Sequence, residues 1–298
     1  MVVGNEDGIR IDRYLSEHYP DLSRSYLQKL LKNGDVLVDG KVIKNNYKVS
    51  EGETIFLDIP DATEPEILPE NMKLDILYED KDLIMVNKPK GMVVHPAAGH
   101  ISGTLVNGLM AHCEDLSGIN GILRPGIVHR IDMDTTGVLV ACKNDFAHKD
   151  IADQLKVHSI TRVYYAIIHG IIREDGIIDA PIGRHPTDRK KMSINEKNGK
   201  SAVTHYHLLK YSDSFSYIEC RLETGRTHQI RVHMASLGHP LLGDSVYGPA
   251  KCPVPGLQGQ TLHAGILGIR HPRTGEYLEV RAPLPEYFEE LLDKLSLK

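Results

Sequence analysis

The segment GIVHRIDMDTTGVLVACKN, residues 126–144, decides how the surrounding chain folds. It contains two short apolar runs, at residues 126–129 and 138–143, on either side of a polar loop at residues 132–137. Short apolar runs bounded by turn residues predict buried strands. Loops that connect rigid strands commonly hold catalytic residues. The segment therefore predicts a strand, a polar loop and a second strand, with candidate catalytic side chains in the loop.

Two interpretations of this loop follow from its residues alone. The pattern D-x-D-x-x-G opens a calcium-binding EF-hand loop, but Lys143 stands where a bidentate Glu is required. The loop also matches the D-x-D-x-T motif of haloacid-dehalogenase-type phosphatases through Asp132, Asp134 and Thr136. Those enzymes need late acidic Mg²⁺ ligands, and the late candidate Asp244 has no apolar strand before it. The first interpretation fails and the second is disfavoured.

The composition sets the class of protein. The chain has 298 residues, of which 41% are hydrophobic and 25% charged, as in a globular protein with one large or two unequal domains. Its formal net charge of −5 excludes a strongly basic nucleic-acid-binding protein and restricts any nucleic-acid contact to a local patch. No apolar run approaches the ~20 residues of a membrane-spanning helix, and the N-terminus lacks signal-peptide features. Four cysteines stand far apart without a C-x-x-C pair, so we expect reduced thiols in a cytoplasmic protein without membrane association.

The distribution of charge and proline divides the chain. Residues 61–86 carry eight acidic and two basic side chains, and residues 59–70 contain three prolines without any periodicity. Such a composition is typical of a linker. We therefore expect an N-terminal domain at residues 1–60, a linker at residues 61–72 and a larger domain at residues 73–298.

The N-terminal domain has the pattern of two short helices followed by a small sheet. Apolar residues recur at helical spacing up to Pro20, and a second helix is expected between an N-cap at Ser23 and a stop at Gly34. Residues 36–43 form a hairpin pattern whose Asp-Gly centre tolerates the positive φ angles of a two-residue turn. A further strand is expected at residues 54–59. This order of elements resembles the S4 RNA-binding domain.

Two basic segments are candidate RNA contacts. The outward face of the predicted second helix carries three cations: Arg24, Lys29 and Lys32. Clustered cations contact RNA phosphates, and the S4 resemblance favours this role over a merely solvated helix face. Residues 184–200 have six basic and two acidic side chains and include Arg189 and Lys190. We expect this segment to be a loop that contacts RNA, with a solvated loop as the alternative.

The larger domain has few helical patterns and many short strands joined by tight turns. Helices are expected after Asn144, at residues 227–237 and at residues 285–295. This pattern predicts an α+β fold in which a largely antiparallel, mixed sheet is flanked by helices and loops.

Four segments of the larger domain resemble the motifs of the RluA/RluD-type RNA pseudouridine synthases. HRIDMDTTG at residues 129–137 is similar to that family's H-R-L-D-x-x-T-S/T-G signature. NKPKGMVVHP at residues 87–96 and RVYYA at residues 162–166 are similar to its N-K-P-x-G-x-x-V-H-P and K-x-Y-x-A segments. LETGRTHQIRVHMASLGHPLLGD at residues 222–244 contains its L-x-T-G-R-T-H-Q-I-R-x-H block. Several long motifs in the family's order, behind an S4 domain, make the resemblance specific.

The resemblance implies an isomerase that converts uridine in RNA to pseudouridine. The C1′–N1 bond breaks, the uracil turns and C1′ is rejoined to C5, so neither a redox cofactor nor a metal is expected. Asp132 is the matched carboxylate and the candidate nucleophile, and the nature of the intermediate stays open. Arg226 matches the arginine expected to pair with it, because an adjacent guanidinium keeps a buried carboxylate ionised. Tyr164 matches the tyrosine that stacks on uracil and relays a proton.

The resemblance also implies base flipping, because a paired uridine is out of reach of an enzyme until it is extruded. Arg130 matches the residue that fills the vacated space, with His129 beside it. The implied substrate is structured RNA, with large-subunit (23S) ribosomal RNA first and transfer RNA second, and we expect a monomer. A non-catalytic RNA-binding factor with the same fold is the alternative class, against which the intact candidate catalytic residues argue.

Other polar residues of these motifs have plainer interpretations. Asp134 is expected to be a turn or capping residue. His228, His233 and His239 are expected to make ordinary polar contacts, because their spacings and the lack of paired acids do not fit a metal site.

Overall fold

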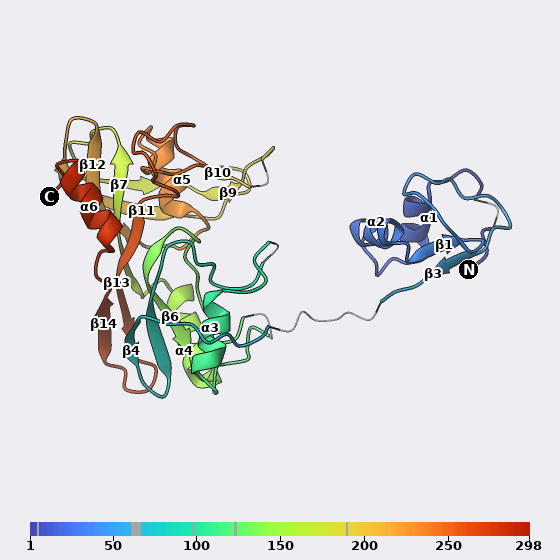
Figure 1. Ribbon diagram of the computed structural model, residues 1–298, viewed down its shortest axis with the longest axis horizontal. Coiled ribbons are helices and arrows are strands. Elements are labelled where there is room, and N and C mark those ends of the chain that lie inside the picture. Colours follow the sequence, from blue (N-terminus) through green and yellow to red (C-terminus); the bar gives the residue numbers. More distant parts are fainter. Residues whose placement is uncertain (5, 61–66, 98, 122–123, 189) are drawn as a thin grey trace. The chain divides into compact units, whose positions relative to one another are not determined.

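The computed structural model describes residues 1–4, 6–60, 67–97, 99–121, 124–188 and 190–298 (Figure 1). The chain divides into two compact units, Met1–Pro65 and Glu66–Lys298. Part of the expected linker, residues 61–66, lies outside the described residues. Within the described ranges, no helix is both long and apolar enough to cross a membrane.

The first unit has two helices and a three-stranded antiparallel sheet in the order β2-β1-β3. Its elements are α1 (Ile11–His18), α2 (Arg24–Asn33), β1 (Val36–Val38), β2 (Lys41–Val42) and β3 (Ile55–Leu57). The Ser23 side chain accepts a hydrogen bond from the backbone N–H of Tyr26, and Gly34 ends α2 with φ +88°. Asp39 and Gly40 both have positive φ in the turn between β1 and β2. The expected caps and hairpin are confirmed.

The second unit is built on a nine-stranded sheet with the order β4-β5-β6-β13-β7-β12-β11-β8, and β14 pairs with β13. The strands are β4 (Ile76–Glu79), β5 (Leu83–Lys88), β6 (Thr136–Cys142), β7 (Thr161–His169), β8 (Gly176–Asp179), β11 (Val203–Tyr211), β12 (Phe215–Leu222), β13 (Leu262–Arg270) and β14 (Tyr277–Arg281). The β6–β13 pair is parallel and the other pairs of this sheet are antiparallel. The α+β fold with a largely antiparallel, mixed sheet is confirmed.

Helices cover both faces of this sheet (Figure 1). On the β5–β6 half, α3 (Leu105–His112) packs on one face and α4 (Asp145–Lys156) on the other, because successive side chains of a strand point to opposite faces. On the β7–β12 half, α5 (Gln229–Ser236) and α6 (Glu286–Lys294) pack in the same two-sided way. The short strands β9 (Ile182–Arg184) and β10 (Met192–Ile194) form a separate hairpin.

The two halves of the sheet meet where β6 and β13 pair. The parallel register covers only Thr136 opposite His263 and Gly137 opposite Ala264. Gly137 has φ +110°, and a Cβ built on it would lie 2.2 Å from the carbonyl oxygen of Ala264. Only glycine accepts both conditions. The glycine of the T-T-G motif thus brings the two strands together and places the preceding polar loop at the junction.

The strand expected at residues 126–129 is wrong. This segment makes a single β-bridge, between Ile127 and Ala141. The backbone N–H of Val140 donates to Nε2 of His129, 3.1 Å away, so a side chain occupies the position that a strand's carbonyl would take. The segment crosses the end of β6 as a loop, which no apolar pattern reveals.

Candidate active site

The polar loop that precedes β6 opens into a cavity. Its lining residues come from the loop, β7, β12, the start of α5 and β13: Arg130, Ile131, Asp132, Thr135, Tyr164, Leu222, Arg226, His228, Gln229, Ile230, Arg231 and Leu262. The three predicted catalytic residues, Asp132, Tyr164 and Arg226, therefore line one cavity although they lie far apart in the sequence.

Arg231, and not Arg226, forms the ion pair with Asp132. Nη1 of Arg231 donates to Oδ2 of Asp132 at 2.8 Å. Nε of Arg226 instead donates to the carbonyl oxygen of Ser201 at 2.8 Å. Arg226 precedes α5, whereas Arg231 lies inside the helix on the side that faces the loop. The sequence R-T-H-Q-I-R holds both arginines, and choosing between them requires the start of the helix at Gln229.

Asp244 fixes the orientation of Arg231. Nε and Nη2 of Arg231 donate to the two oxygens of Asp244 at 2.7 and 3.0 Å. The Asp244 side chain is fully buried, and its Oδ1 also accepts the backbone N–H groups of Val246 and Tyr247. Burial alone would raise the pKa of Asp244, but the hydrogen bonds and charge of Arg231 outweigh it and hold the pKa below its usual value. The sequence offered Asp244 only as a candidate metal ligand, because its pairing with Arg231 depends on the fold.

His228 faces the other oxygen of Asp132. Its Nε2 lies 3.9 Å from Oδ1, and its backbone is left-handed with φ +57°, a strained conformation for a residue with a side chain. Nδ1 lies 2.8 Å from the hydroxyl of Tyr247, which accepts the backbone N–H of Met192. The hydroxyl proton is then free for Nδ1, which leaves the ring proton on Nε2, facing Asp132. Burial lowers the pKa of His228, so the ring stays neutral. The sequence predicted only ordinary polar contacts for His228, whereas the structure places its ring beside the candidate nucleophile.

Tyr164 presents its ring to the cavity from β7, while Tyr165 points to the opposite face and packs near Tyr217. Burial, with a further contribution from the charge of Asp132, raises the pKa of Tyr164 above its usual value. The phenol is therefore protonated at neutral pH and can donate a hydrogen bond.

His129 and Arg130 have different environments. Burial, and then the charge of Arg162, lowers the pKa of His129 to about 4. The ring is neutral, and since Nε2 accepts from Val140, its proton is on Nδ1. Arg130 is exposed at the rim of the cavity and makes no ion pair with the described residues.

Lys88, the lysine of the N-K-P segment, forms buried hydrogen bonds that hold the candidate catalytic loop in place. Its side chain is fully buried, and Nζ donates to the carbonyl oxygens of Pro89, Met92 and Met133 at 2.8, 2.8 and 2.9 Å. Three acceptors satisfy the three donors of an ammonium group. Met133 follows Asp132, so this lysine ties the N-K-P segment to the candidate catalytic loop.

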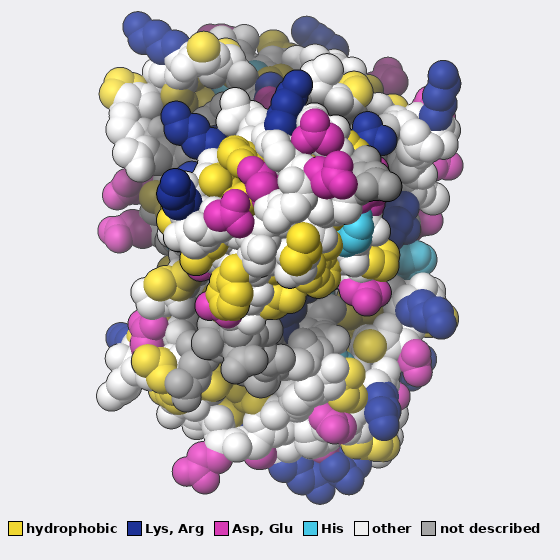
Figure 2. Space-filling model, turned by 90° about the vertical axis from the view of Figure 1, so that its right-hand side faces the viewer, with side chains coloured by type: hydrophobic (Ala, Val, Ile, Leu, Met, Phe, Trp, Pro, Cys, Tyr) yellow, Lys and Arg dark blue, Asp and Glu magenta, His cyan; other side chains and the backbone are white. Residues whose placement is uncertain are grey.

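The side chains predicted to contact RNA differ in whether a carboxylate of the protein already pairs with them. Lys29 and Lys32 are exposed and make no ion pair with the residues that the structure describes. Arg24 instead donates to the buried carboxylate of Asp12 at 2.9 and 3.1 Å, so part of its role is structural. Lys190 is exposed between β9 and β10, and Arg189 lies outside the described residues. In Figure 2, basic and acidic side chains alternate over the visible face.

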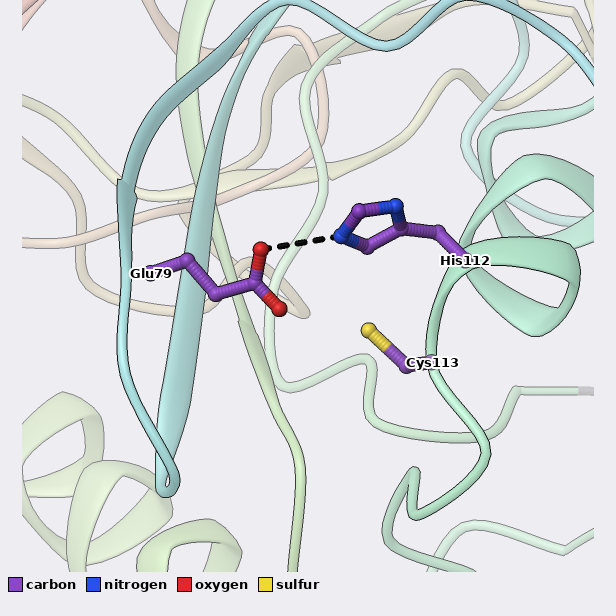
Figure 3. Close-up of side chains that lie close together, drawn as sticks. All are labelled: Glu79, His112 and Cys113. Carbon is purple, nitrogen blue, oxygen red and sulfur yellow. Dashed lines mark hydrogen bonds and ion pairs between the residues drawn. The ribbon is translucent and has the colours of Figure 1, made fainter.

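Among the described residues, two clusters have metal-binding residue types, and neither includes a residue that lines the Asp132 cavity. In the first, Nε2 of His112 lies 2.9 Å from Glu79, with Cys113 beside them (Figure 3). Lys143 donates to the other oxygen of Glu79 at 2.9 Å, and burial raises the pKa of the Cys113 thiol to about 11. The carboxylate is thus already paired and the thiol keeps its proton, so these residues form a hydrogen-bonded link between β4 and α3.

The second cluster has the same character. It comprises Asp80, Asp82 and His271. Arg273 forms two hydrogen bonds with Asp82, and His271 lies 2.7 Å from Asp80. An arginine therefore supplies the positive charge that a metal ion would bring, and the cluster joins the β4–β5 turn to the β13–β14 turn.

Comparisons with known proteins agree with this geometry. Residues 82–236 match the family model described as RNA pseudouridylate synthase, and residues 9–55 match that of the S4 domain. An uncharacterized RNA pseudouridine synthase of Bacillus subtilis is 54% identical over 96% of this chain and 94% of its own length. Ribosomal large subunit pseudouridine synthase D of Zymomonas mobilis is 45% identical over 97% and 95%. The solved structure of human RNA pseudouridylate synthase domain containing 1 has a TM-score of 0.59 and 26% identity and covers 76% of this chain and 96% of its own.

Proposed function

The chain belongs to the RNA pseudouridylate synthase family and carries an S4 domain, and from that premise we propose that it isomerises specific uridines of large-subunit ribosomal RNA to pseudouridine. The name of the relative from Zymomonas mobilis, 45% identical over nearly the whole chain, favours this substrate over transfer RNA. The observation that carries the catalytic role is the placement of Asp132, Arg231 and Tyr164 around one cavity.

Asp132 is the nucleophile in this proposal. Arg231 holds Oδ2, while Oδ1 accepts no hydrogen bond from the described residues and is free to react. As Oδ1 bonds to C1′, the C1′–N1 bond breaks with its electron pair on the uracil. The base then turns, and C5 bonds to C1′ while the C1′–Oδ1 bond breaks and frees the carboxylate. The C5 proton then leaves and N1 ends protonated, so atoms and charge balance in an isomerisation.

The other cavity residues act on the uracil. As negative charge develops on the departing base, the Nε2–H of His228 is placed to donate to a uracil carbonyl. The protonated phenol of Tyr164 stacks against the base and relays the C5 proton. Arg130, at the exposed rim, fills the space that the extruded uridine leaves, with His129 supporting the turn of the chain beside it.

The isomerase role is tested with RNA tritiated at uridine C5. The wild-type chain should release tritium from large-subunit ribosomal RNA, whereas Asp132→Asn should release none and bind the same RNA with nearly unchanged affinity. Turnover retained by Asp132→Asn would overturn the nucleophile assignment. Release from transfer RNA alone would move the substrate to the second class, and binding without release by the wild type would indicate an RNA-binding factor.

The proposal extends to the setting of the enzyme. We propose residues 1–60 as the RNA-binding domain, 61–72 as a linker and 73–298 as the catalytic domain of a cytoplasmic monomer. Light scattering on the purified chain should give a mass near the 33.3 kDa of one copy. A dimer at micromolar concentration would contradict the monomer.

A further inference from the structure

A second cavity, of about 260 Å³, adjoins the Asp132 cavity. Its lining consists of Val128, His129, Arg130, Leu155, His158, Arg162, Tyr164, Leu222, Gly225 and Arg226. It shares four of these residues with the Asp132 cavity: Arg130, Tyr164, Leu222 and Arg226. The two cavities are therefore neighbours with common walls, and a group bound in the second lies beside whatever fills the first.

Within the described part of the chain, this second cavity, here called the arginine pocket, is lined by three arginines and no carboxylate. Arg162 is only 8% exposed, and its Nη2 donates to the carbonyl oxygen of Glu223 at 2.9 Å. Its buried Nε has no acceptor among the residues that the structure describes. Arg226 bonds a backbone carbonyl as well, and Arg130 has no carboxylate partner among the described residues. Burying a cation without a paired anion costs free energy, so the pocket favours binding of a negatively charged group.

The groups around Arg162 also favour a bound anion. Burial, together with the charge of Arg226, lowers the pKa of Arg162. Nδ1 of the neutral His129 carries a proton and adds a donor to the pocket wall. A Cβ built on Gly225 would lie 2.4 Å from Nη1 of Arg162, so the glycine of the T-G-R motif leaves room for the guanidinium.

We propose that the arginine pocket binds one phosphodiester of the substrate RNA, directly beside the flipped uridine. The inference rests on the proposed function, because it assumes that RNA fills the adjoining cavity. Guanidinium groups pair with phosphate oxygens through two parallel hydrogen bonds, which fixes position as well as adding affinity. The bound phosphate neutralises Arg162 and sets the ribose against Asp132. Arg226, which the sequence placed beside the nucleophile, then contacts the backbone of the same nucleotide.

A double-mutant cycle tests the contact. One partner is Arg162→Gln, and the other is an RNA carrying a single uncharged methylphosphonate, moved one linkage at a time around the modified uridine. At one linkage, the methylphosphonate should reduce RNA affinity and kcat/KM of the wild type about tenfold, the size expected for a charge-assisted hydrogen bond. Arg162→Gln should lose about as much on unmodified RNA. The combination should lose less than about twofold more.

The matched control is Arg281→Gln, which removes the same charge from an exposed side chain of β14 outside both cavities. It should leave the methylphosphonate effect unchanged. Because Arg162 is buried, folding is checked by circular dichroism, and the exposed Arg130→Gln provides a second cycle that does not disturb the core. Fully additive losses in both cycles at every linkage would overturn the inference.

The two proposals fail in different ways. RNA affinity reports the phosphate contact without any turnover. A wild-type chain that binds RNA but never isomerises it would contradict the proposed function, and the double-mutant cycle in affinity would still test the phosphate contact. Tritium release by the wild type, combined with additive losses in the cycles, would leave the proposed function standing and remove the phosphate site.

Discussion

Arg231 joins two carboxylates that lie more than a hundred residues from each other in the chain, Asp132 and Asp244. One guanidinium serves both, so the pair of anions is only partly neutralised. Asp244 receives the two-bond, buried contact, and Asp132 receives a single bond to one oxygen. This unequal division anchors Asp132 through one oxygen while its second oxygen stays available for reaction.

Asp244→Asn is expected to lower the free energy of unfolding by about 3 kcal/mol at pH 7, the cost of breaking a buried ion pair. The pKa of Asp244 is depressed in the folded chain, so its stabilising contribution is present above about pH 4, the pKa of an unfolded Asp, and is lost as the pH falls through the folded value. The stability difference between wild type and variant should therefore shrink below pH 4, as urea titrations followed by circular dichroism will show.

Asp153→Asn serves as the control for this prediction, since Asp153 is exposed on α4. It should change stability by less than about 0.5 kcal/mol, as surface substitutions usually do. A difference between wild type and Asp244→Asn that stays constant down to pH 2 would contradict the assigned ion pair.

Some residues of the candidate site could be predicted from the sequence, and others could not. Asp132 and Tyr164 occupy fixed positions of the family motifs H-R-L-D and K-x-Y, so the resemblance was enough to predict them. The partner of Asp132 was misassigned, because R-T-H-Q-I-R offers two arginines and the side that faces the loop depends on where the helix starts. His228 was missed for another reason: its orientation comes from a left-handed backbone and a bond to Tyr247, which no local pattern encodes.

At the scale of elements, the shortest strand pairing in the large sheet lies beside the candidate site. β6 and β13 share a register of two residue pairs, and the candidate catalytic loop enters β6 at that point. The β4–β5 and β13–β14 hairpins were predictable from short strands joined by tight turns. The parallel contact was not predictable, since it joins segments more than 120 residues apart and Gly137 is the sequence feature that marks it.

Gly137→Ala is expected to destabilise the second unit by about 3 kcal/mol or more, because it combines backbone strain with a clash. Its Cβ would meet the Ala264 carbonyl, which is backbone and cannot turn aside. Thermal unfolding followed by circular dichroism measures the loss. Gly118→Ala is the matched control, because its φ is not positive and a Cβ there meets nothing within 4 Å. Equal melting temperatures for the two variants would contradict the close approach of β6 and β13.

At the scale of the whole molecule, the proposed RNA contacts lie in both units. The cations of α2 are not equivalent: Lys29 and Lys32 are exposed and pair with no carboxylate of the described residues, whereas Arg24 is bonded to the buried Asp12. The helix pattern predicted where all three lie. It could not reveal that one of them is engaged, because Asp12 sits on the other helix.

Replacing Lys29 and Lys32 together with Gln should weaken RNA binding and reduce the slope of log K against log salt by about 2, one unit for each lost phosphate contact. Filter binding between 50 and 200 mM salt, a range over which such contacts change affinity strongly, measures it. Lys149→Gln with Lys294→Gln removes the same charge from exposed positions of α4 and α6 and should leave the slope nearly unchanged. An unaltered slope in the α2 variant would mean that this helix face is only solvated.

The buried ammonium of Lys88 has a consequence for engineering. It crosslinks the backbone of Pro89 and Met92 to that of Met133 without any covalent bond. A chimaera that imports the loop after Asp132 from another enzyme while keeping its own N-K-P segment would mismatch donor and acceptors in a dry interior. Retargeting this scaffold therefore calls for transplanting residues 87–92 and 132–135 as one cassette.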